Sequence, residues 1–377
     1  MNALLRQSKL LGWRQRVLTV LKAAASAETG VGSRWMASAS SAIKQTEAAA
    51  AHGNSEVEDG AVGQENPLWG ATIVDVKDVF RGRDDGSSAV RMLRLQVSQR
   101  PKQGSGDVLK YLGGQWVDMF IPGIKQIGGY TITSAQNLPP GVASAVQAPQ
   151  RGDELELVVR QARHPPAAWV HSTDCRAGSE VEIRVGGVFT LSSCRVVVSE
   201  KELSRREAAA LDSSSSQSSS FNGSARFICS NVILIGGGVG LNPLYSMLLE
   251  IAAAAASGVD SVPSVDVVYS VKTVEDAVML WRLEALLQGP LKDKMRLIVC
   301  LTGGKQHPFD GDDAGRESAR LVQGRADVSL LEELTKGRSR DDTVALVCGP
   351  KGMAEDVKEM LVKVGVAPDA VHFESWW

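Results

Sequence analysis

A glycine-rich turn is the stretch of this sequence whose residue types are best suited to chemistry. Over Asn231–Leu249 the chain reads NVILIGGGVGLNPLYSMLL, with glycines at Gly236, Gly237, Gly238 and Gly240. An apolar strand that feeds a glycine turn and then a helix lets backbone N–H groups approach a pyrophosphate, and the helix N-terminus adds positive potential. The stretch therefore predicts a dinucleotide-phosphate site, with a turn that binds nothing as the alternative.

The turn departs from the ordinary dinucleotide fingerprint in two places. Pro243 stands where the third glycine is expected, and it suits a first helical turn because its missing N–H would have no partner there. The next strand ends in Tyr269–Lys272 without the acid that would hold a ribose. Lys272 is either a surface lysine or a contact to a ribose 2′-phosphate, so the choice between NADH and NADPH stays open.

The sequence lacks the motifs of several other classes of protein. There is no G-x-x-x-x-G-K-[ST] motif and no G-x-S-x-G elbow, which excludes a P-loop nucleotidase and a serine hydrolase. His164 and His171 flank Trp169 without the spacing of a metal pair, so we expect no metal site. The five cysteines are scattered, with no C-x-x-C pair or iron–sulfur spacing.

Composition indicates a soluble globular chain long enough for two cores. Its 377 residues are 44% hydrophobic, and the formal net charge is only −2, without a basic stripe that would favour nucleic acid. No apolar stretch reaches the roughly 20 residues of a membrane helix, so we expect neither nucleic acid as a partner nor a membrane span.

The N-terminus resembles an organelle leader. Residues 1–36 are rich in arginine and lysine, their first acid is Glu28, and their leucines can gather on one helical face. We therefore expect a transit peptide cleaved near Met36 and a mitochondrial protein, with a plastid as the alternative destination and an ordinary surface helix as the alternative structure. Residues 37–66 lack periodicity and predict a disordered linker.

Residues 67–198 predict a small antiparallel barrel. Short segments with alternating or β-branched residues are separated by glycine and proline turns. The six expected strands are Gly70–Phe80, Val90–Val97, Gln115–Ile121, Glu154–Arg160, Glu180–Val185 and Arg195–Val198. Residues 199–225, with a serine run, predict a low-complexity connection.

Residues 226–377 predict a parallel α/β domain, because apolar strands alternate with helical segments. The expected strands are Val232–Ile235, Val265–Tyr269, Arg296–Leu301 and Val344–Val347. The expected helices are Pro243–Ala256, Val274–Leu287, Val328–Thr335 and Met353–Val364. Gly303–Gly324 has the composition of a solvent loop.

Four segments together resemble the NAD(P)-binding domain of the ferredoxin–NADP reductase superfamily. They read IGGGVGLNPLYSML, VVYSVKTVEDAVMLWRLEAL, LVCGPKGMAEDVKEMLVKVGV and, at the chain end, VHFESWW. The resemblance spans residues 67–377. The segments VDMFIPGIKQIGGYTITSAQ, RHPPAAWVHS and EVEIRVGGVF, with the final Trp-Trp pair, are more narrowly similar to its mitochondrial branch of oxidoreductase NAD-binding domain-containing proteins.

The resemblance implies a barrel that binds FAD through the motif R-x-[YF]-[ST]. Tyr130 and Thr131 match the aromatic that meets the isoalloxazine and the hydroxyl near its N5, but Gly128 stands where the arginine would hold the phosphate. The second flavin motif, G-x-x-S before an apolar pair, is replaced by His164–Val170.

The missing charge has three candidate substitutes nearby in the sequence, namely Arg160, Arg163 and His164. A lost charged partner removes about 1.5–3 kcal/mol of phosphate binding, so FAD is expected only with reduced affinity.

On the nicotinamide side the resemblance implies a motif CGP-x-x-M, met here by Cys348, Gly349, Pro350 and Met353. Cys348 is either a group near the nicotinamide C4 or a small buried hydrophobe. Glu374 is either a polar partner of the nicotinamide or a solvated terminal acid.

Trp377 either covers a cofactor ring, together with Trp376, or seals an edge between the domains. With Thr131, Cys348 and Glu374 as catalytic candidates, we expect a flavin-type oxidoreductase that passes a hydride from NAD(P)H to FAD and electrons on to an unidentified acceptor. The alternatives are a catalytically degenerate dinucleotide-binding sensor or assembly partner, and a subunit whose flavin site is completed by a partner protein.

Overall fold

The computed structural model describes residues 66–82, 88–98, 109–199, 225–259, 261–303 and 319–375. All of these residues belong to one compact unit, Asn66–Trp377. The expected transit peptide, almost all of the expected linker, most of the low-complexity connection and the Trp376–Trp377 pair lie outside the described residues, so those expectations stay predictions.

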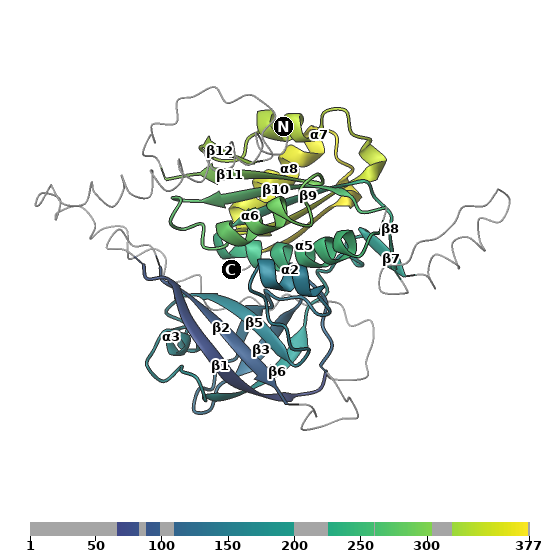
Figure 1. The fold of residues 1–377 in the computed structure, drawn as a ribbon. Coiled ribbons are helices and arrows are strands. Elements are labelled where there is room, and N and C mark those ends of the chain that lie inside the picture. Colours follow the sequence, from purple (N-terminus) through teal and green to yellow (C-terminus); the bar gives the residue numbers. More distant parts are fainter. Residues whose placement is uncertain are drawn as a thin grey trace, which may run out of the picture. The chain divides into compact units, whose positions relative to one another are not determined.

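The first sheet is an antiparallel barrel (Figure 1). Its strands are β1 (Trp69–Phe80), β2 (Val90–Val97), β3 (Trp116–Phe120), β4 (Gly128–Thr131), β5 (Glu154–Arg160) and β6 (Glu180–Gly186), with the short helices α2 (Pro140–Ala145) and α3 (Pro165–Val170) between them. The order is β4-β3-β6-β1-β2-β5, and a bridge between Ile132 and Leu157 joins the two edges. Alternating residues such as Leu155, Leu157 and Val159 fill the interior.

The barrel has six strands, as expected, but the sixth was assigned wrongly. Arg195–Val198 is not a barrel strand: β7 (Val197–Ser199) pairs with β8 (Ala225–Phe227) in a separate ribbon. The sixth strand is β4, whose GGYT sequence carries too little strand propensity to stand out. Its pairing with β3 defines it instead.

The second sheet is parallel throughout, with the order β12-β11-β10-β9-β13-β14. Its strands are β9 (Asn231–Gly237), β10 (Ser264–Val271), β11 (Met295–Leu301), β12 (Ala319–Gln323), β13 (Thr343–Gly349) and β14 (Val371–Ser375). Its helices are α5 (Leu241–Ala256), α6 (Leu280–Gln288), α7 (Val328–Thr335) and α8 (Lys351–Lys363), with the 3-10 turns η1 (Gly238–Gly240), η2 (Arg340–Asp342) and η3 (Pro368–Ala370).

The fold class is therefore confirmed, with three corrections in the second domain. The edge strands β12 and β14 were missed, and β12 lies inside the expected loop Gly303–Gly324 because a half-exposed edge strand lacks a continuous apolar run. The expected helix Val274–Leu287 begins only at Leu280, since Thr273 and Asp276 cap a turn ahead of it.

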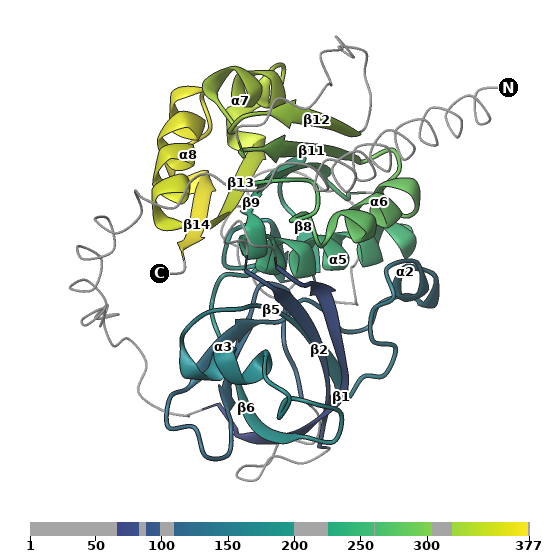
Figure 2. The same ribbon diagram turned by 90° about the vertical axis from the view of Figure 1, so that its left-hand side faces the viewer.

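Helices cover both faces of the parallel sheet, as Figures 1 and 2 show: α5 and α6 lie on one face, α7 and α8 on the other. Within the described residues, one helix, Gly238–Ala256, is long and apolar enough to cross a membrane, but 78% of that window is buried inside the protein. Its apolar character is accounted for by a core position against β9 and β13.

Candidate nicotinamide-dinucleotide site

The glycine turn lies at the switch point of the parallel sheet. β9 occupies the centre, α5 leads from it toward β10, and β13 pairs along the other side of β9. In an open parallel sheet the crevice at the carboxyl ends of such a strand pair is where ligands bind. The start of α5, whose first N–H groups have no intrahelical partner, faces that end of the sheet.

Two glycines of the turn are required for different physical reasons. Gly240 has an ordinary helical φ of −63°, but a Cβ there would lie 2.5 Å from the Cys348 carbonyl oxygen and 2.7 Å from the Gly349 Cα. Gly238 has open space around it, but its φ of +55° is left-handed. Gly240 lets the turn approach β13, and Gly238 lets the chain bend into α5.

The CGP-x-x-M segment packs directly on the turn. A Cβ at Gly237 would lie 2.6 Å from the Met353 Sδ and 3.1 Å from the Pro350 Cδ, and one at Gly349 would lie 3.1 Å from the same sulfur. The structure thus brings the glycine turn together with Gly349, Pro350 and Met353, the expected cofactor residues at and just after the end of β13. Pro243, also expected, is buried in the first turn of α5.

Two of the expected catalytic residues, Cys348 and Glu374, are register partners on neighbouring strands. Cys348 lies opposite Glu374 on one side and Gly236 on the other, at the carboxyl end of the sheet. Val347 and Val371 pack among the α7 and α8 side chains. Because side chains alternate along a strand, Cys348 and Glu374 emerge on the α5 face instead. Cys348 is fully buried, and Glu374 is half-buried.

Barrel residues also reach α5, and the sequence did not predict these contacts. Asn242 is the second residue of α5, and its Nδ2 donates to the Val158 carbonyl at 2.9 Å. The Gly113 N–H donates to Glu250 at 2.6 Å, and the Gly114 N–H donates to the Ser246 hydroxyl at 2.8 Å.

Arg160 extends the barrel side of this contact. Leu157 and Val159 point into the barrel core, so Glu156 and Arg160 face outward, and Glu156 is bound to Arg282 of α6. Val158 lies between Glu156 and Arg160 in the strand, and its carbonyl accepts the hydrogen bond from Asn242 at the start of α5. Arg160 therefore lies on the barrel strand beside the glycine turn. It is exposed and, among the described residues, forms no ion pair.

Tyr130 and Thr131, the expected flavin residues, lie on β4 and point to opposite faces. Tyr130 is paired with Val117, a buried core residue, so its ring lies on the inner side of the barrel. Burial raises the pKa of its hydroxyl, which has no hydrogen-bond partner in the part of the chain that the structure describes. Thr131 faces outward beside Trp116.

The position of the motif arginine does not fit an FAD phosphate. A Cβ at Gly128 would lie 2.5 Å from the Tyr130 ring and 2.9 Å from the Pro166 Cβ. Position 128 thus lacks both the charge and the space for a side chain, so we assign no reaction step to FAD.

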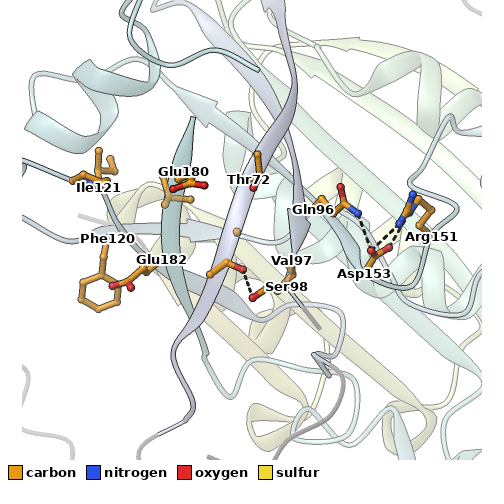
Figure 3. Close-up of a pocket in the computed structure, with 14 residues that line it drawn as sticks. Thr72, Gln96, Val97, Ser98, Phe120, Ile121, Arg151, Asp153, Glu180 and Glu182 are labelled. Atoms are coloured by element: carbon orange, nitrogen blue, oxygen red, sulfur yellow. Dashed lines mark hydrogen bonds and ion pairs between the residues drawn. The ribbon is translucent and has the colours of Figure 1, made fainter. Parts of the chain in front are cut away.

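A pocket of about 860 Å³ lies elsewhere on the barrel, and Figure 3 shows its lining. It is formed by the ends of β1, β2, β3 and β6, and its charged groups include Asp153, Glu180 and Glu182. Arg151 is held there by both carboxylate oxygens of Asp153, at 3.0 Å each. Three carboxylates disfavour an anionic dinucleotide, and none of the expected site residues lines the pocket.

The five cysteines are buried, and burial raises the pKa of the thiol in four of them, which disfavours the reactive thiolate there. Burial raises the pKa of Cys175 and Cys300 to about 11 and that of Cys229 to about 12. Burial also raises the pKa of Cys194 to about 12, and the charge of Glu374 adds to the shift. No group of three His, Cys, Asp or Glu residues suited to a metal is found in the described ranges.

Comparison with solved structures identifies the class of fold. The Amycolatopsis cytochrome P450 reductase GcoB superposes over 85% of this chain and 72% of its own, with a TM-score of 0.54 and 19% identity. The ferredoxin-NADP+ reductase from Plasmodium falciparum does so over 82% of this chain and 96% of its own, with a TM-score of 0.50 and 14% identity. The chain therefore has the two-domain fold of the ferredoxin reductases.

Sequence comparison gives the nearer resemblance. Residues 234–359 match the family described as oxidoreductase NAD-binding domain. The oxidoreductase NAD-binding domain-containing protein 1 of Danio rerio is 28% identical over 297 residues, which are 77% of this chain and 88% of that protein. The resemblance that the motifs predicted is thus confirmed.

Proposed function

We propose that this chain binds a nicotinamide dinucleotide at the glycine turn and acts as an NAD(P)H-dependent oxidoreductase of the ferredoxin reductase type. The observation that carries the proposal is the close approach of Gly240 to the Cys348 carbonyl, which places a helix N-terminus at the switch point of the sheet. The pyrophosphate would lie against the turn and the start of α5. The nicotinamide would then lie toward Cys348 and Glu374, on the face that these residues share.

The flavin-linked form of this proposal has hydride passing from NAD(P)H to FAD and electrons continuing to an acceptor that no residue identifies. The fold and the pair Tyr130–Thr131 support it, whereas the filled position beside Gly128 weighs against FAD as a resident group. The proposal therefore rests on the nicotinamide donor, and the acceptor is left open.

A second candidate function is a dinucleotide-binding sensor or assembly partner without turnover. The specific observation in its favour is the same filled position at Gly128, because a chain that binds NAD(P)H but has no acceptor cannot complete a redox cycle. A partner protein that completes the site would reconcile the two candidates.

Gly238 offers a direct test of the nicotinamide site. Its left-handed φ of +55° is accessible to Asn and Asp, and the space beside it is open. We expect Gly238→Asp to weaken NADH or NADPH binding at least about tenfold relative to Gly238→Asn, since the variants differ only in a charge that would repel the phosphates. Titration calorimetry on the full chain measures this, and equal affinities would refute the proposed site.

An absorbance experiment then separates the two functions. Anaerobic addition of NADH or NADPH to the full chain, with an added flavin or an artificial acceptor, would reduce the acceptor if the protein is an oxidoreductase. Tight nicotinamide binding with no acceptor reduced would favour the sensor.

We further propose a mitochondrial location for the chain. The support is the arginine-rich, acid-poor character of residues 1–36. A fluorescent fusion of the full chain should enter mitochondria, and a version lacking residues 1–36 should not. Import into plastids instead would correct the destination.

A further inference from the structure

The start of α3 gives a second reason to question how this barrel would hold a flavin nucleotide. The helix begins with Pro165 and Pro166, and neither has an N–H group to donate. The Ala168 N–H, two residues after Pro166, donates to the His164 carbonyl at 2.9 Å. A phosphate at this helix start would find one backbone donor, Ala167, where an ordinary helix offers several.

Pro166 links this helix start to β4. Its Cβ lies 2.9 Å from where a Cβ of Gly128 would stand, and the Tyr130 ring lies against the same point. The two flavin motifs implied by the family resemblance therefore meet in space, and the space between them is occupied by a proline and an aromatic ring. The proline is apolar, and the Tyr130 hydroxyl is the ring's polar group but carries no positive charge to balance a phosphate.

Arg91, which contacts the end of α3, is committed to other partners. Arg91 donates through Nη1 to the carbonyls of Val170 and Ser172, at 2.8 and 3.1 Å, and through Nε to Asp78 at 2.7 Å. The three candidate substitutes, Arg160, Arg163 and His164, are exposed, and no ion pair or side-chain hydrogen bond among the described residues holds any of them beside Gly128.

We propose that this barrel does not recognise the phosphates of a flavin nucleotide, so that it retains no FAD and holds any flavin by the ring system alone. This inference concerns the flavin-binding side of the molecule. It rests on the proposed function only in taking NAD(P)H as the electron donor. Tyr130 and Pro166 fill with their side chains the space that a cationic side chain at position 128 would need.

The test compares riboflavin, FMN and FAD as ligands of the purified full chain, by quenching of flavin fluorescence. We expect no flavin to copurify, and the dissociation constants of FMN and FAD to lie within tenfold of that of riboflavin, or none of the three to bind. Copurified FAD, or FMN or FAD bound more than about tenfold tighter than riboflavin, would overturn the proposal, because one charge-assisted phosphate contact is worth at least that factor.

A gain-of-binding variant probes the cause. Replacing both Pro165 and Pro166 by alanine restores two N–H donors at the start of α3 and keeps the Cβ of residue 166 beside Gly128, so the preference for FMN over riboflavin should rise at least about tenfold through the new donors alone. The matched control replaces Pro139 and Pro140 by alanine at the start of α2, another short helix that begins with proline. An unchanged preference in a variant that keeps its melting temperature would overturn the account.

Nicotinamide titrations of the same samples report on the other half of the molecule. A protein that does not bind NAD(P)H would refute the proposed function but would leave the flavin result unchanged. Tight binding of FAD would refute the inference about the barrel but would leave the nicotinamide site unaffected.

Discussion

Arg282 of α6 and Glu156 of β5 form a buried ion pair between the parallel domain and the barrel. The Arg282 Nη2 donates to the Glu156 Oε2 at 2.9 Å, Nη1 contacts Oε1, and both side chains are at most 2% exposed. The Thr133 hydroxyl donates to the same carboxylate at 3.2 Å, and the guanidinium lies 5.9 Å from the Tyr245 ring centroid. Burial alone would lower the pKa of Arg282, but the hydrogen bond and charge of Glu156 raise it overall.

This pair makes a double-mutant cycle informative. Either Arg282→Met or Glu156→Leu should cost about 3–5 kcal/mol of unfolding free energy, because each leaves a buried charge without its two-pronged partner, and Arg94, 3.8 Å from the Glu156 Oε2, is only partly buried. The double variant should lose clearly less than the sum, since it buries no charge. Urea unfolding of the four proteins measures the coupling, and additive losses would show that the two charges do not stabilise each other.

The glycine turn makes a prediction that separates space from backbone conformation. Gly240→Ala should cost about 1–3 kcal/mol, because its Cβ would meet the Cys348 carbonyl, which is backbone and cannot move aside. Gly238→Ala should cost roughly 1–2 kcal/mol through its left-handed φ alone. Gly129→Ala is the control, since no heavy atom lies within 4 Å of its Cβ position. A neutral Gly240→Ala in thermal unfolding would contradict the packing described here.

The sequence predicted the parts of the fold that depend on local rules. Gly240 and Pro350 lie where two chain segments cross closely. The crossing restricts which residue types fit at each position, so both residues can be identified as parts of motifs from a single sequence. The ion pair of Glu156 and Arg282 was invisible, because its partners are 126 residues apart and each looks like an isolated charge in an apolar element.

The flavin side shows a subtler limit of sequence reasoning. Tyr130 was expected to meet a cofactor because its motif position is right, but which side of β4 it faces depends on the register with Val117. From the sequence, the missing arginine at Gly128 predicts only a lost charge. Only the structure shows that the Tyr130 ring and Pro166 also take up the space.

Glu250 predicts a pH-dependent stability. Burial raises the pKa of its carboxyl from 4.5 to about 7, although the hydrogen bond from the Gly113 N–H lowers it in part. Because the folded pKa exceeds the unfolded one, this contribution is fully present below about pH 4.5 and is lost as the pH rises through about 7.

Glu250→Gln keeps an acceptor for Gly113 but does not ionise. Relative to wild type it should therefore gain stability from pH 5 to pH 8, by at most about 3 kcal/mol. Denaturant unfolding at several pH values measures the difference. Glu359→Gln, at an exposed position of α8, is the control, and parallel curves for wild type and Glu250→Gln would contradict the assignment.

Arg160 yields a prediction about the dinucleotide itself. It follows Val158, whose carbonyl is bonded to Asn242 at the start of α5, and its alternation on β5 directs it away from the barrel core. We expect its guanidinium to supply a cation to the nicotinamide dinucleotide phosphates across the crevice. Arg160→Gln should weaken NAD(P)H binding about tenfold and make the affinity less sensitive to salt, because a charge-assisted contact is removed.

Arg163→Gln is the matched control, since Arg163 lies beyond the end of β5 and is also exposed. Calorimetric titrations at two salt concentrations compare the variants. Equal losses in both would mean that the general positive charge of this segment attracts the dinucleotide. No loss in either would place the phosphates away from β5, so that the turn and the α5 N-terminus would have to bind them unaided.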